Sequence, residues 1–222
     1  MHVLILSPYP DALIAPIEAR GDRVTVRSDL VSEAEFEALR PDWIISYGYR
    51  RLIASPALEM CAGRIVNLHI SLLPFNRGAD PNFWSWVDYT PKGVTLHLID
   101  AGMDTGPILV QREVELDPDT ETLKSSYLRL RREIEELFAL HWDDIVCGGL
   151  QPRVQTTSLP IHRAADKAKL FAMLPLGWDS PASAVMRLPR IAQDGLVGEA
   201  PDQDCPRGTG AHDLAAPDRT AN

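Results

Sequence analysis

Two short polar segments carry residue types that together suit acyl transfer to an amine. Residues 67–74 read NLHISLLP and residues 102–107 read GMDTGP. The amide of Asn67 can stabilise an oxyanion, the imidazole of His69 can carry a proton, and the carboxylate of Asp104 can orient or charge that imidazole. The unperturbed pKa of histidine, near ~6.5, makes His69 the best proton carrier of the three. No cysteine or serine beside the histidine forms a nucleophile motif, so the chemistry needs no acyl-enzyme.

The elements that must position these residues alternate between strand and helix signals over residues 1–150. This alternation predicts an α/β fold built on an open, doubly wound, mostly parallel sheet. Sites in such sheets form beyond the carboxyl ends of the strands, so loops at 48–51, 69–77 and 100–106 are expected on one edge. Strands are expected at Val3–Leu6, Arg23–Val26, Trp43–Ser46, Ile65–Leu68, Gly93–Ile99 and Ile108–Val114, the last two as a hairpin.

Helices are expected where apolar residues recur with helical spacing behind a capping residue. Ser32 and Glu35 form a capping-box pattern, and Tyr127 to Leu140 carry an apolar stripe on the longest helical segment. Core packing and a dimer interface explain that stripe equally well. The expected helices are Asp11–Arg20, Ser32–Leu39, Pro56–Cys61, Asn82–Val87, Thr122–Cys147 and Pro181–Arg190.

Composition divides the chain into three expected parts and bounds its class. Residues 1–150 form the catalytic domain, 151–194 a small C-terminal extension with weak periodicity, and 195–222 a disordered tail poor in large apolar residues. The net charge of −9 argues mildly against polyanionic partners. Cys61, Cys147 and Cys205 show no metal or disulfide spacing and fit a reducing, cytoplasmic location. The N-terminus does not read as a signal peptide, and no apolar run approaches the ~20 residues of a membrane span.

Several ordered motifs resemble the formyltransferases that use N10-formyltetrahydrofolate. Besides the two segments above, they are Asn76-Arg77-Gly78, Pro81-Asn82 and the run from Gly93 to His97. The resemblance covers residues 1–150 and implies a Rossmann-like formyltransferase domain. It implies N10-formyltetrahydrofolate as co-substrate, no metal, and a catalytic triad of Asn67, His69 and Asp104. A homodimer is a further implication at the level of the family.

The resemblance also assigns residues to two binding regions. The loop after Tyr47 and the stretch before Asp104 match the walls of the family's folate pocket, which implies cofactor contacts from Arg51, Leu52, Ile53, Ile99, Asp100 and Gly102. The acceptor amine is expected to contact Ser71, Leu73, Pro74, Asn76, Arg77 and Trp84. Among these, Arg77 could pair with a phosphate and Trp84 could stack on a ring, although a core role for an aromatic of this segment is the stronger expectation.

The motifs resemble most closely the enzymes that formylate amino-sugar nucleotides for surface polysaccharides. Glycinamide ribonucleotide enzymes usually carry proline where this chain has Ile70, and a glycine-rich loop where it has Ser7-Pro8-Tyr9-Pro10. Methionyl-tRNA enzymes usually add a basic C-terminal barrel, whereas the last 70 or so residues here are acidic. The expected partner is therefore a nucleotide-linked amino sugar, with no nucleic acid and no membrane.

Alternatives from other classes stay open. A hydrolase that releases formate from the same donor shares the triad but usually adds an N-terminal regulatory domain. A non-catalytic folate-binding module would keep the fold, and transfer to methionyl-tRNA or glycinamide ribonucleotide would keep the chemistry. Two further histidines have a structural and a functional interpretation. His97 is expected to pack or to form hydrogen bonds rather than to catalyse, and His162 is expected on the surface rather than in contact with the substrate. Residues 155–181 are expected over the acceptor side.

Overall fold

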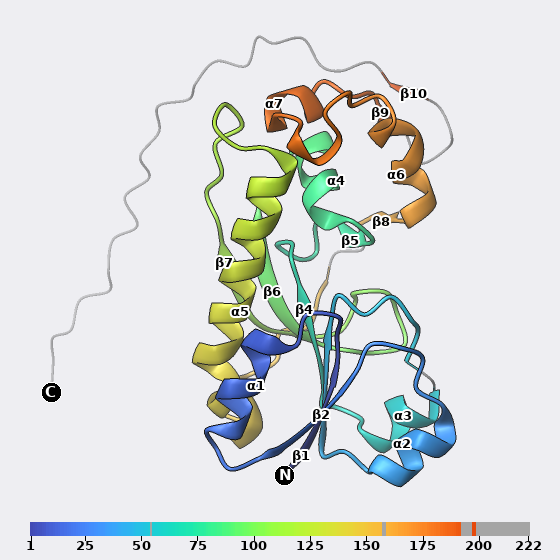
Figure 1. Cartoon of the computed structure of the whole chain (residues 1–222), viewed down its shortest axis with the longest axis vertical. Helices are drawn as coiled ribbons and strands as arrows, with labels where there is room; N and C mark the ends of the chain where they lie inside the picture. Colours follow the sequence, from blue (N-terminus) through green and yellow to red (C-terminus); the bar gives the residue numbers. More distant parts are fainter. Residues whose placement is uncertain (54, 157–158, 192–196, 199–222) are drawn as a thin grey trace, which may run out of the picture.

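A six-stranded sheet forms the centre of the molecule, and the order of its strands is β2-β1-β3-β4-β6-β7. The computed structural model describes the whole chain except residues 54, 157–158, 192–196 and 199–222 (Figure 1). Four strands run parallel, and β6 and β7 are antiparallel to their neighbours. The expected mostly parallel sheet and its hairpin are therefore confirmed. The strands are β1 His2–Leu6, β2 Arg23–Arg27, β3 Trp43–Tyr47, β4 Ile65–His69, β6 Gly93–Leu98 and β7 Ile108–Glu113.

Helices cover both faces of this sheet (Figure 1). Alternate residues of β1 point to opposite faces, so Ile5 packs in the cluster under α1 and α5, while Leu4 packs in the cluster under α2 and α3. Such two-sided burial explains why Val3–Leu6 in β1 reads as a continuous apolar run. The helices are α1 Asp11–Glu18, α2 Glu33–Leu39, α3 Ser55–Met60 and α5 Leu123–Cys147.

Capping residues set the start of two of these helices. The Ser32 side chain accepts a hydrogen bond from the Glu35 backbone N–H at 3.3 Å, which is half of the predicted capping box; the Glu35 side chain instead accepts from Arg27 at 2.6 Å. Thr122 caps α5 through a reciprocal pair of hydrogen bonds with Ser125. On α5, Ile134 and Phe138 are fully buried and Leu140 is exposed. The apolar stripe is therefore mainly a core feature within one chain.

A second, smaller apolar cluster joins the C-terminal extension to α4 (Pro81–Val87). Every residue of α4 is buried, since it packs against Leu170, Leu174 and Val185 of the extension. The extension consists of β8 Ile161–His162, α6 Ala164–Phe171, the 3₁₀ helix η1 Gly177–Asp179 and α7 Ala182–Val185. β8 pairs in parallel with β5 (Arg77–Gly78), which ties the extension to the loop after β4.

The helix expected at Pro181–Arg190 is shorter in the structure, where α7 covers only Ala182–Val185. The segment after α7 ends in β9 (Arg190–Ile191), which pairs with β10 (Val197–Gly198). Leu188 lies in the α4 cluster, so burial rather than helical periodicity fixes this segment. Apart from β10, the expected disordered tail at 195–222 lies outside the described residues. Among the helices of the described ranges, none is long and apolar enough to span a bilayer.

Candidate active site

The C-terminal end of β4 presents Asn67 and His69 on one face of the strand. Residues two apart in a strand point to the same side, and Leu68 between them packs into the main core. Both side chains face Asp104, which lies in the loop between β6 and β7. The Asn67 Nδ2 atom donates to Asp104 Oδ1 at 3.2 Å, and His69 Nδ1 lies 3.8 Å from Asp104 Oδ2. The structure thus brings the three expected catalytic residues together.

The loop that carries Asp104 is held by close backbone contacts. Asp104 has a left-handed backbone with φ of 52°, a conformation that asparagine and aspartate tolerate better than most residues. The backbone N–H of Gly78 donates to Asp104 Oδ2 at 2.8 Å. Gly106 follows where a Cβ would lie 1.8 Å from the carbonyl oxygen of Leu98. This tight approach explains the glycine and fixes the path of the loop.

The ring of His69 is buried, and one of its nitrogens has a backbone partner. His69 Nε2 lies 3.2 Å from the carbonyl oxygen of Asn76, which can only accept, so we assign the proton of the neutral ring to Nε2. The lone pair then lies on Nδ1, the nitrogen that faces Asp104. Burial lowers the pKa of His69, and the charge of Asp104 opposes this effect only in part. His69 is therefore a neutral base at neutral pH.

Asp104 stays ionised next to this neutral imidazole. Burial by itself would raise the pKa of Asp104, but its interactions with the rings of His69 and His97 and the N–H of Gly78 outweigh it. The pKa of Asp104 consequently lies well below the usual range of aspartate. A charged carboxylate beside Nδ1 can stabilise the imidazolium that forms when His69 accepts a proton.

His97 on β6 belongs to the same network. It lies opposite Asn67 in the β4–β6 register, and its Nε2 lies 3.1 Å from Asn67 Nδ2 and 3.5 Å from Asp104 Oδ1. Its Nδ1 lies 2.9 Å from the carbonyl oxygen of Leu98. The expected hydrogen-bonding role of His97 is confirmed, and its partners turn out to be two of the three catalytic candidates.

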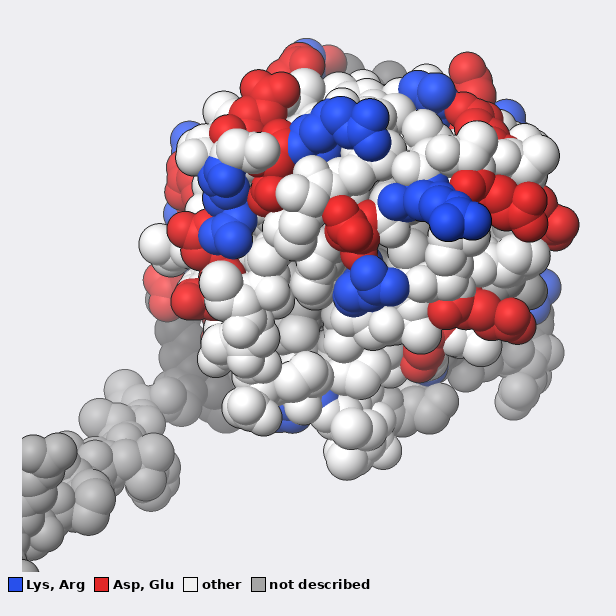
Figure 2. Space-filling model, turned by 90° about the horizontal axis from the view of Figure 1, so that it is seen from below, with Lys and Arg blue, Asp and Glu red and all other residues white. Residues whose placement is uncertain are grey.

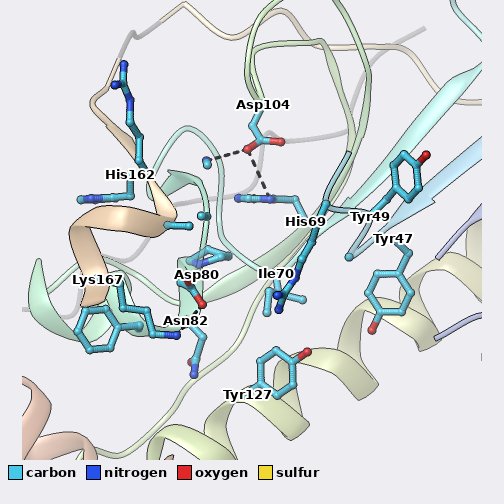
Figure 3. A pocket seen from close by; sticks show the side chains of 18 of the residues that line it. Tyr47, Tyr49, His69, Ile70, Asp80, Asn82, Asp104, Tyr127, His162 and Lys167 are labelled. Atoms are coloured by element: carbon cyan, nitrogen blue, oxygen red, sulfur yellow. Dashed lines mark hydrogen bonds and ion pairs between the residues drawn. The ribbon is translucent and has the colours of Figure 1, made fainter. Parts of the chain in front are cut away.

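Asn67, His69 and Asp104 line one end of a cavity of about 880 Å³. Figure 3 shows Asp104 and His69 at one end and Tyr127 at the other, with Lys167 and His162 on a wall formed by the C-terminal extension. The Lys167 ammonium donates to Asp80 at 2.7 Å and lies 4.5 Å from the ring centroid of Trp178. The cavity thus combines a reactive end with a long wall of aromatic and cationic side chains.

The residues expected to bind the cofactor fall on two neighbouring loops. Arg51 and Leu52 line the cavity and are exposed. Ile53 and Ile99 pack against one core cluster, that under α2 and α3, which sets the two loops side by side. Asp100 folds the second loop, because its side chain accepts from the Gly102 N–H at 2.9 Å and from Thr105 at 2.6 Å. Contact of these residues with folate stays a prediction.

The residues expected to bind the acceptor lie behind the cavity wall rather than on it. Arg77 is 4% exposed and donates to the carbonyl of Leu159. Trp84 is 1% exposed and stacks on His162 at 4.1 Å, so it meets the cavity only through that histidine. Asn76 supports His69 through its carbonyl. Ser71 and Leu73 are also buried, and Pro74 is half-buried. Their direct contact with an acceptor stays a prediction.

Several cavity residues were not identified from the sequence. His162, half-buried in the structure, was expected on the surface, but it lines the cavity and lies 2.8 Å from Asp88. Asp80, Tyr127 and Lys167 were not among the residues expected to bind either substrate, although Tyr127 was expected in the apolar stripe and Lys167 within the segment 155–181. Helical spacing placed Tyr127 in an apolar stripe. Lys167 lies on α6, in a segment whose apolar residues show no clear periodicity. Neither Tyr127 nor Lys167 therefore carried its own signal of substrate binding. Within the described residues, no cluster of three histidine, cysteine or acidic side chains could hold a metal ion.

With this geometry established, comparison with known proteins identifies the family. The family model described as formyl transferase matches residues 17–140, more than half of the chain. The chain belongs to the formyltransferase family. This confirms the resemblance carried by the motifs, and the matched range contains Asn67, His69 and Asp104.

Individual formyltransferases extend the match beyond this range. The formyltransferase PseJ from Anoxybacillus kamchatkensis, solved with UDP-4,6-dideoxy-4-formamido-L-AltNAc and tetrahydrofolate, is 40% identical. It superposes with a TM-score of 0.79 over 83% of this chain and 97% of that one. A sugar N-formyltransferase from a Shewanella species, 20% identical, shares the fold with a TM-score of 0.69 over 90% of this chain and 96% of that one.

Curated sequences give a second group of relatives. A methionyl-tRNA formyltransferase from Trichlorobacter lovleyi is 36% identical over 161 residues, which are 72% of this chain and 49% of that protein. The chain therefore spans about half the length of the curated relatives it matches. Family membership and fold are common to both groups, whereas the acceptor differs between them.

Proposed function

We propose that this formyltransferase moves the formyl group of N10-formyltetrahydrofolate to the amine of a nucleotide-linked amino sugar. The proposal rests on the convergence of Asn67, His69 and Asp104 at one end of a cavity large enough for two substrates. The 40% identity to PseJ over most of both chains supports this acceptor class, because PseJ was solved with a formylated amino-sugar nucleotide.

The donor half of the cavity lies beside the exposed loop at Arg51 and Leu52. This loop and the Ile99–Gly102 loop flank the sheet edge next to Asp104. A pterin ring between them would bring N10 and its formyl group toward the three catalytic residues. The backbone of the two loops, turned by Asp100, would offer hydrogen-bond donors and acceptors to the pterin edge.

The acceptor half lies along the wall from His162 to Tyr127. Lys167 supplies a cation near the ring faces of Phe171 and Trp178, at 4.9 and 4.5 Å. Trp178 is 40% exposed and lies 5.7 Å from Tyr127, measured between ring centroids. An exposed aromatic face can stack on a nucleobase, and an ammonium group can pair with a diphosphate. These are the two features that a sugar nucleotide presents besides its amine.

The chemistry follows from the geometry of the reactive end. The acceptor amine attacks the formyl carbon, and the carbonyl oxygen becomes an oxyanion to which Asn67 Nδ2 can donate. Nδ1 of His69 takes the proton that the attacking nitrogen must lose, and Asp104 stabilises the resulting imidazolium. As the intermediate collapses, the bond to folate N10 breaks, and His69 returns a proton to that nitrogen. No covalent intermediate with the protein forms.

In the resting structure, both N–H groups of the Asn67 amide face other partners. One donates to Asp104, and the other faces Nε2 of His97, which accepts when the neutral His97 ring carries its proton on Nδ1 beside the Leu98 carbonyl. An oxyanion can therefore accept from Asn67 only by sharing or replacing one of these bonds. Asn67 would then donate fully to the carbonyl oxygen only when negative charge develops on that oxygen. Such an interaction stabilises the transition state more than the ground state.

A direct assay tests the proposal. The purified protein, N10-formyltetrahydrofolate and a UDP-linked 4-amino-4,6-dideoxy sugar should yield a product heavier by one formyl group in place of one hydrogen, read by mass spectrometry. The His69→Ala variant, which should yield none, controls for uncatalysed transfer. Absence of product with a panel of amino-sugar nucleotides, together with tight folate binding, would overturn the acceptor assignment.

Transfer to methionyl-tRNA is the second candidate, because the curated relatives carry that name. A tRNA acceptor needs a basic surface to neutralise phosphates. The one face drawn in Figure 2 carries Lys and Arg interspersed with Asp and Glu and shows no extended basic patch. The net charge of −9 acts in the same direction. The same assay with methionyl-tRNA decides between the two acceptors. Formate release without any amine would instead indicate hydrolysis of the donor.

A further inference from the structure

Gln155, in the segment that follows α5, reaches back to the loop that carries Asp104. Its Nε2 atom donates to the carbonyl oxygen of Asp104 at 3.0 Å and to the carbonyl oxygen of Gly106 at 2.8 Å. One amide group thus bridges the two ends of the Asp104-Thr105-Gly106 turn. Two carbonyl partners also fix the orientation of the amide, because carbonyl oxygens only accept.

The backbone that presents Gln155 is itself anchored to the sheet. Ile108 and Arg153 exchange two backbone hydrogen bonds of 2.8 Å, which form one antiparallel bridge beside the start of β7. The Arg153 side chain donates to Gln111 at 2.5 Å, and Gln111 donates to the carbonyl oxygen of Leu73 at 2.8 Å. Gln155 therefore comes from a segment that is attached to β7 at two positions, Ile108 and Gln111.

The bridged turn needs such support. Asp104 holds a left-handed backbone with φ of 52°, and conformations of this kind persist only where the surroundings fix them. The carboxylate on this residue must meet Gly78, Asn67 and His69 at once. A rotation of the Asp104 peptide would move the carboxylate away from all three, although each of them would remain in place.

We propose that Gln155 is a positioning residue of the formyl-transfer reaction, acting through the backbone of the Asp104 turn rather than on the substrates. The inference rests on the proposed role of Asp104. It assigns a catalytic contribution to the first part of the C-terminal extension, which lies outside the matched family range of 17–140. Gln155 does not line the cavity, so its loss should change the rate of the reaction more than the binding of either substrate.

Gln155→Glu tests this inference with the smallest change of shape. The substitution replaces the donor atom with a carboxylate oxygen aimed at two carbonyls, and the turn should shift. We expect kcat to fall about 100-fold, the scale of a ~1 Å misplacement of a catalytic group, while KM for both substrates changes less than about twofold. Gln151→Glu makes the same charge change at an exposed position of the same segment and serves as the matched control. Equal kcat values for the two variants would overturn the proposal.

A double-mutant cycle separates positioning from a general loss of structure. If Gln155 acts through Asp104, then Gln155→Glu causes little further loss of kcat in an Asp104→Asn background. Losses that multiply would show that Gln155 acts independently of Asp104, and the proposal would be wrong. The cycle can be measured with any amine that the wild-type enzyme formylates. A wrong acceptor assignment would therefore not affect its interpretation.

A readout on the protein alone does not depend on the proposed function. The titratable groups whose charges act on His69 are Asp104, which raises its pKa, and His97, which lowers it. Displacement of Asp104 in Gln155→Ala should therefore lower the pKa of His69, followed by NMR of the imidazole nitrogens, whereas Gln151→Ala should leave it unchanged. A His69 pKa that is the same in both variants would contradict the proposal even if no acceptor were known.

Discussion

Asn67 and His97 face each other across the antiparallel β4–β6 pair, and their side-chain nitrogens meet at 3.1 Å. The contact of His97 Nδ1 with the Leu98 carbonyl requires a proton on Nδ1, so Nε2 of the neutral ring accepts from Asn67. This interaction, with the bond to Asp104, sets the orientation of the amide that we propose stabilises the oxyanion.

Removal of this amide should slow the chemical step. We expect Asn67→Ala to lower kcat by about 10²–10³, the usual loss for one oxyanion donor, because among the described residues Asn67 is the one side-chain amide that donates to the Asp104 carboxylate. His97→Leu should cause a smaller loss, since the donor remains but is free to turn. Steady-state kinetics measure both, with His141→Leu, outside the cavity, as control. A larger loss for His97→Leu than for Asn67→Ala would assign the main role to His97.

The burial of His69 predicts the acid limb of the pH–rate profile. Burial lowers the pKa of this histidine, so the neutral base persists below the ordinary value of ~6.5. We expect kcat to stay level as the pH falls through 6.5 or so and to decline only at lower pH. His69→Ala should lower kcat by about 10²–10⁴, with folate affinity retained. A fall in kcat centred at or above the ordinary histidine pKa would contradict a neutral His69 base.

Neutralisation of Asp104 should change both the rate and this pH dependence. The charge of Asp104 raises the pKa of His69 against the effect of burial. In Asp104→Asn that opposition is lost, so the acid limb should move to lower pH while the maximal rate falls. The pH–rate profiles of the two proteins, compared at saturating substrate, measure the shift. An acid limb that moves to higher pH would show that another group controls it.

Protonation of the same pair should also affect stability. Since the folded-state pKa of Asp104 lies below the unfolded value, the stability from its ionised form is present above ~3.9 and lost as the pH falls toward the folded pKa. His69 acts in the same direction, because below ~6.5 the unfolded chain binds a proton that the folded chain does not. Urea unfolding should therefore show a free energy that decreases with falling pH, less steeply in His69→Gln.

A single methyl group should be enough to displace the Asp104 turn. In Gly106→Ala the added Cβ would lie 1.8 Å from the Leu98 carbonyl oxygen, so the backbone must move. We expect a loss of kcat of about 10²-fold and a lower melting temperature. Gly149→Ala is the matched control, since its nearest neighbour atoms lie at 3.5 Å, an ordinary contact. Full activity in Gly106→Ala would show that the turn tolerates movement.

The acceptor wall predicts a selective effect on one substrate. Lys167→Met removes the ammonium between Asp80 and Trp178 but keeps an apolar stem of similar length. KM for a sugar nucleotide should rise about tenfold, which corresponds to about 1.4 kcal/mol, whereas KM for the folate donor should not change. Lys169→Met, at an exposed position of the same helix, provides the control. An increase in KM for the folate donor would place the two substrates the other way round in the cavity.

Local patterns in the sequence were sufficient for most of the sheet and for part of the site. Apolar runs at Val3–Leu6 and Trp43–Ser46 predicted two of the parallel strands, because both faces of the sheet are covered by helices. The two-residue spacing of Asn67 and His69 at a strand end already placed both on one face. The Ser32 capping box gave the start of α2 to the residue, since that interaction involves only neighbours in the chain.

Contacts between distant segments could not be derived in this way. Arg77 and Trp84 have side chains suited to ligand binding, but the extension covers them. Lys167 and Gln155 lie in a segment whose apolar residues show no clear helical or strand periodicity. Through the packing of that extension, Lys167 reaches the cavity and Gln155 reaches the turn that carries Asp104. The hydrogen bonds that decided these roles join residues at least 49 positions apart, as between Gln155 and Gly106.

The sequence by itself determined the fold class and the three candidate catalytic side chains, because apolar periodicity and residue chemistry are local properties of a chain. The tertiary structure alone decided which nitrogen of His69 is free, which residues form the acceptor wall, and what holds the Asp104 turn. Those features depend on strand register and on the packing of the C-terminal extension. Both are settled by burial and hydrogen-bond satisfaction over the whole molecule, which no single segment specifies.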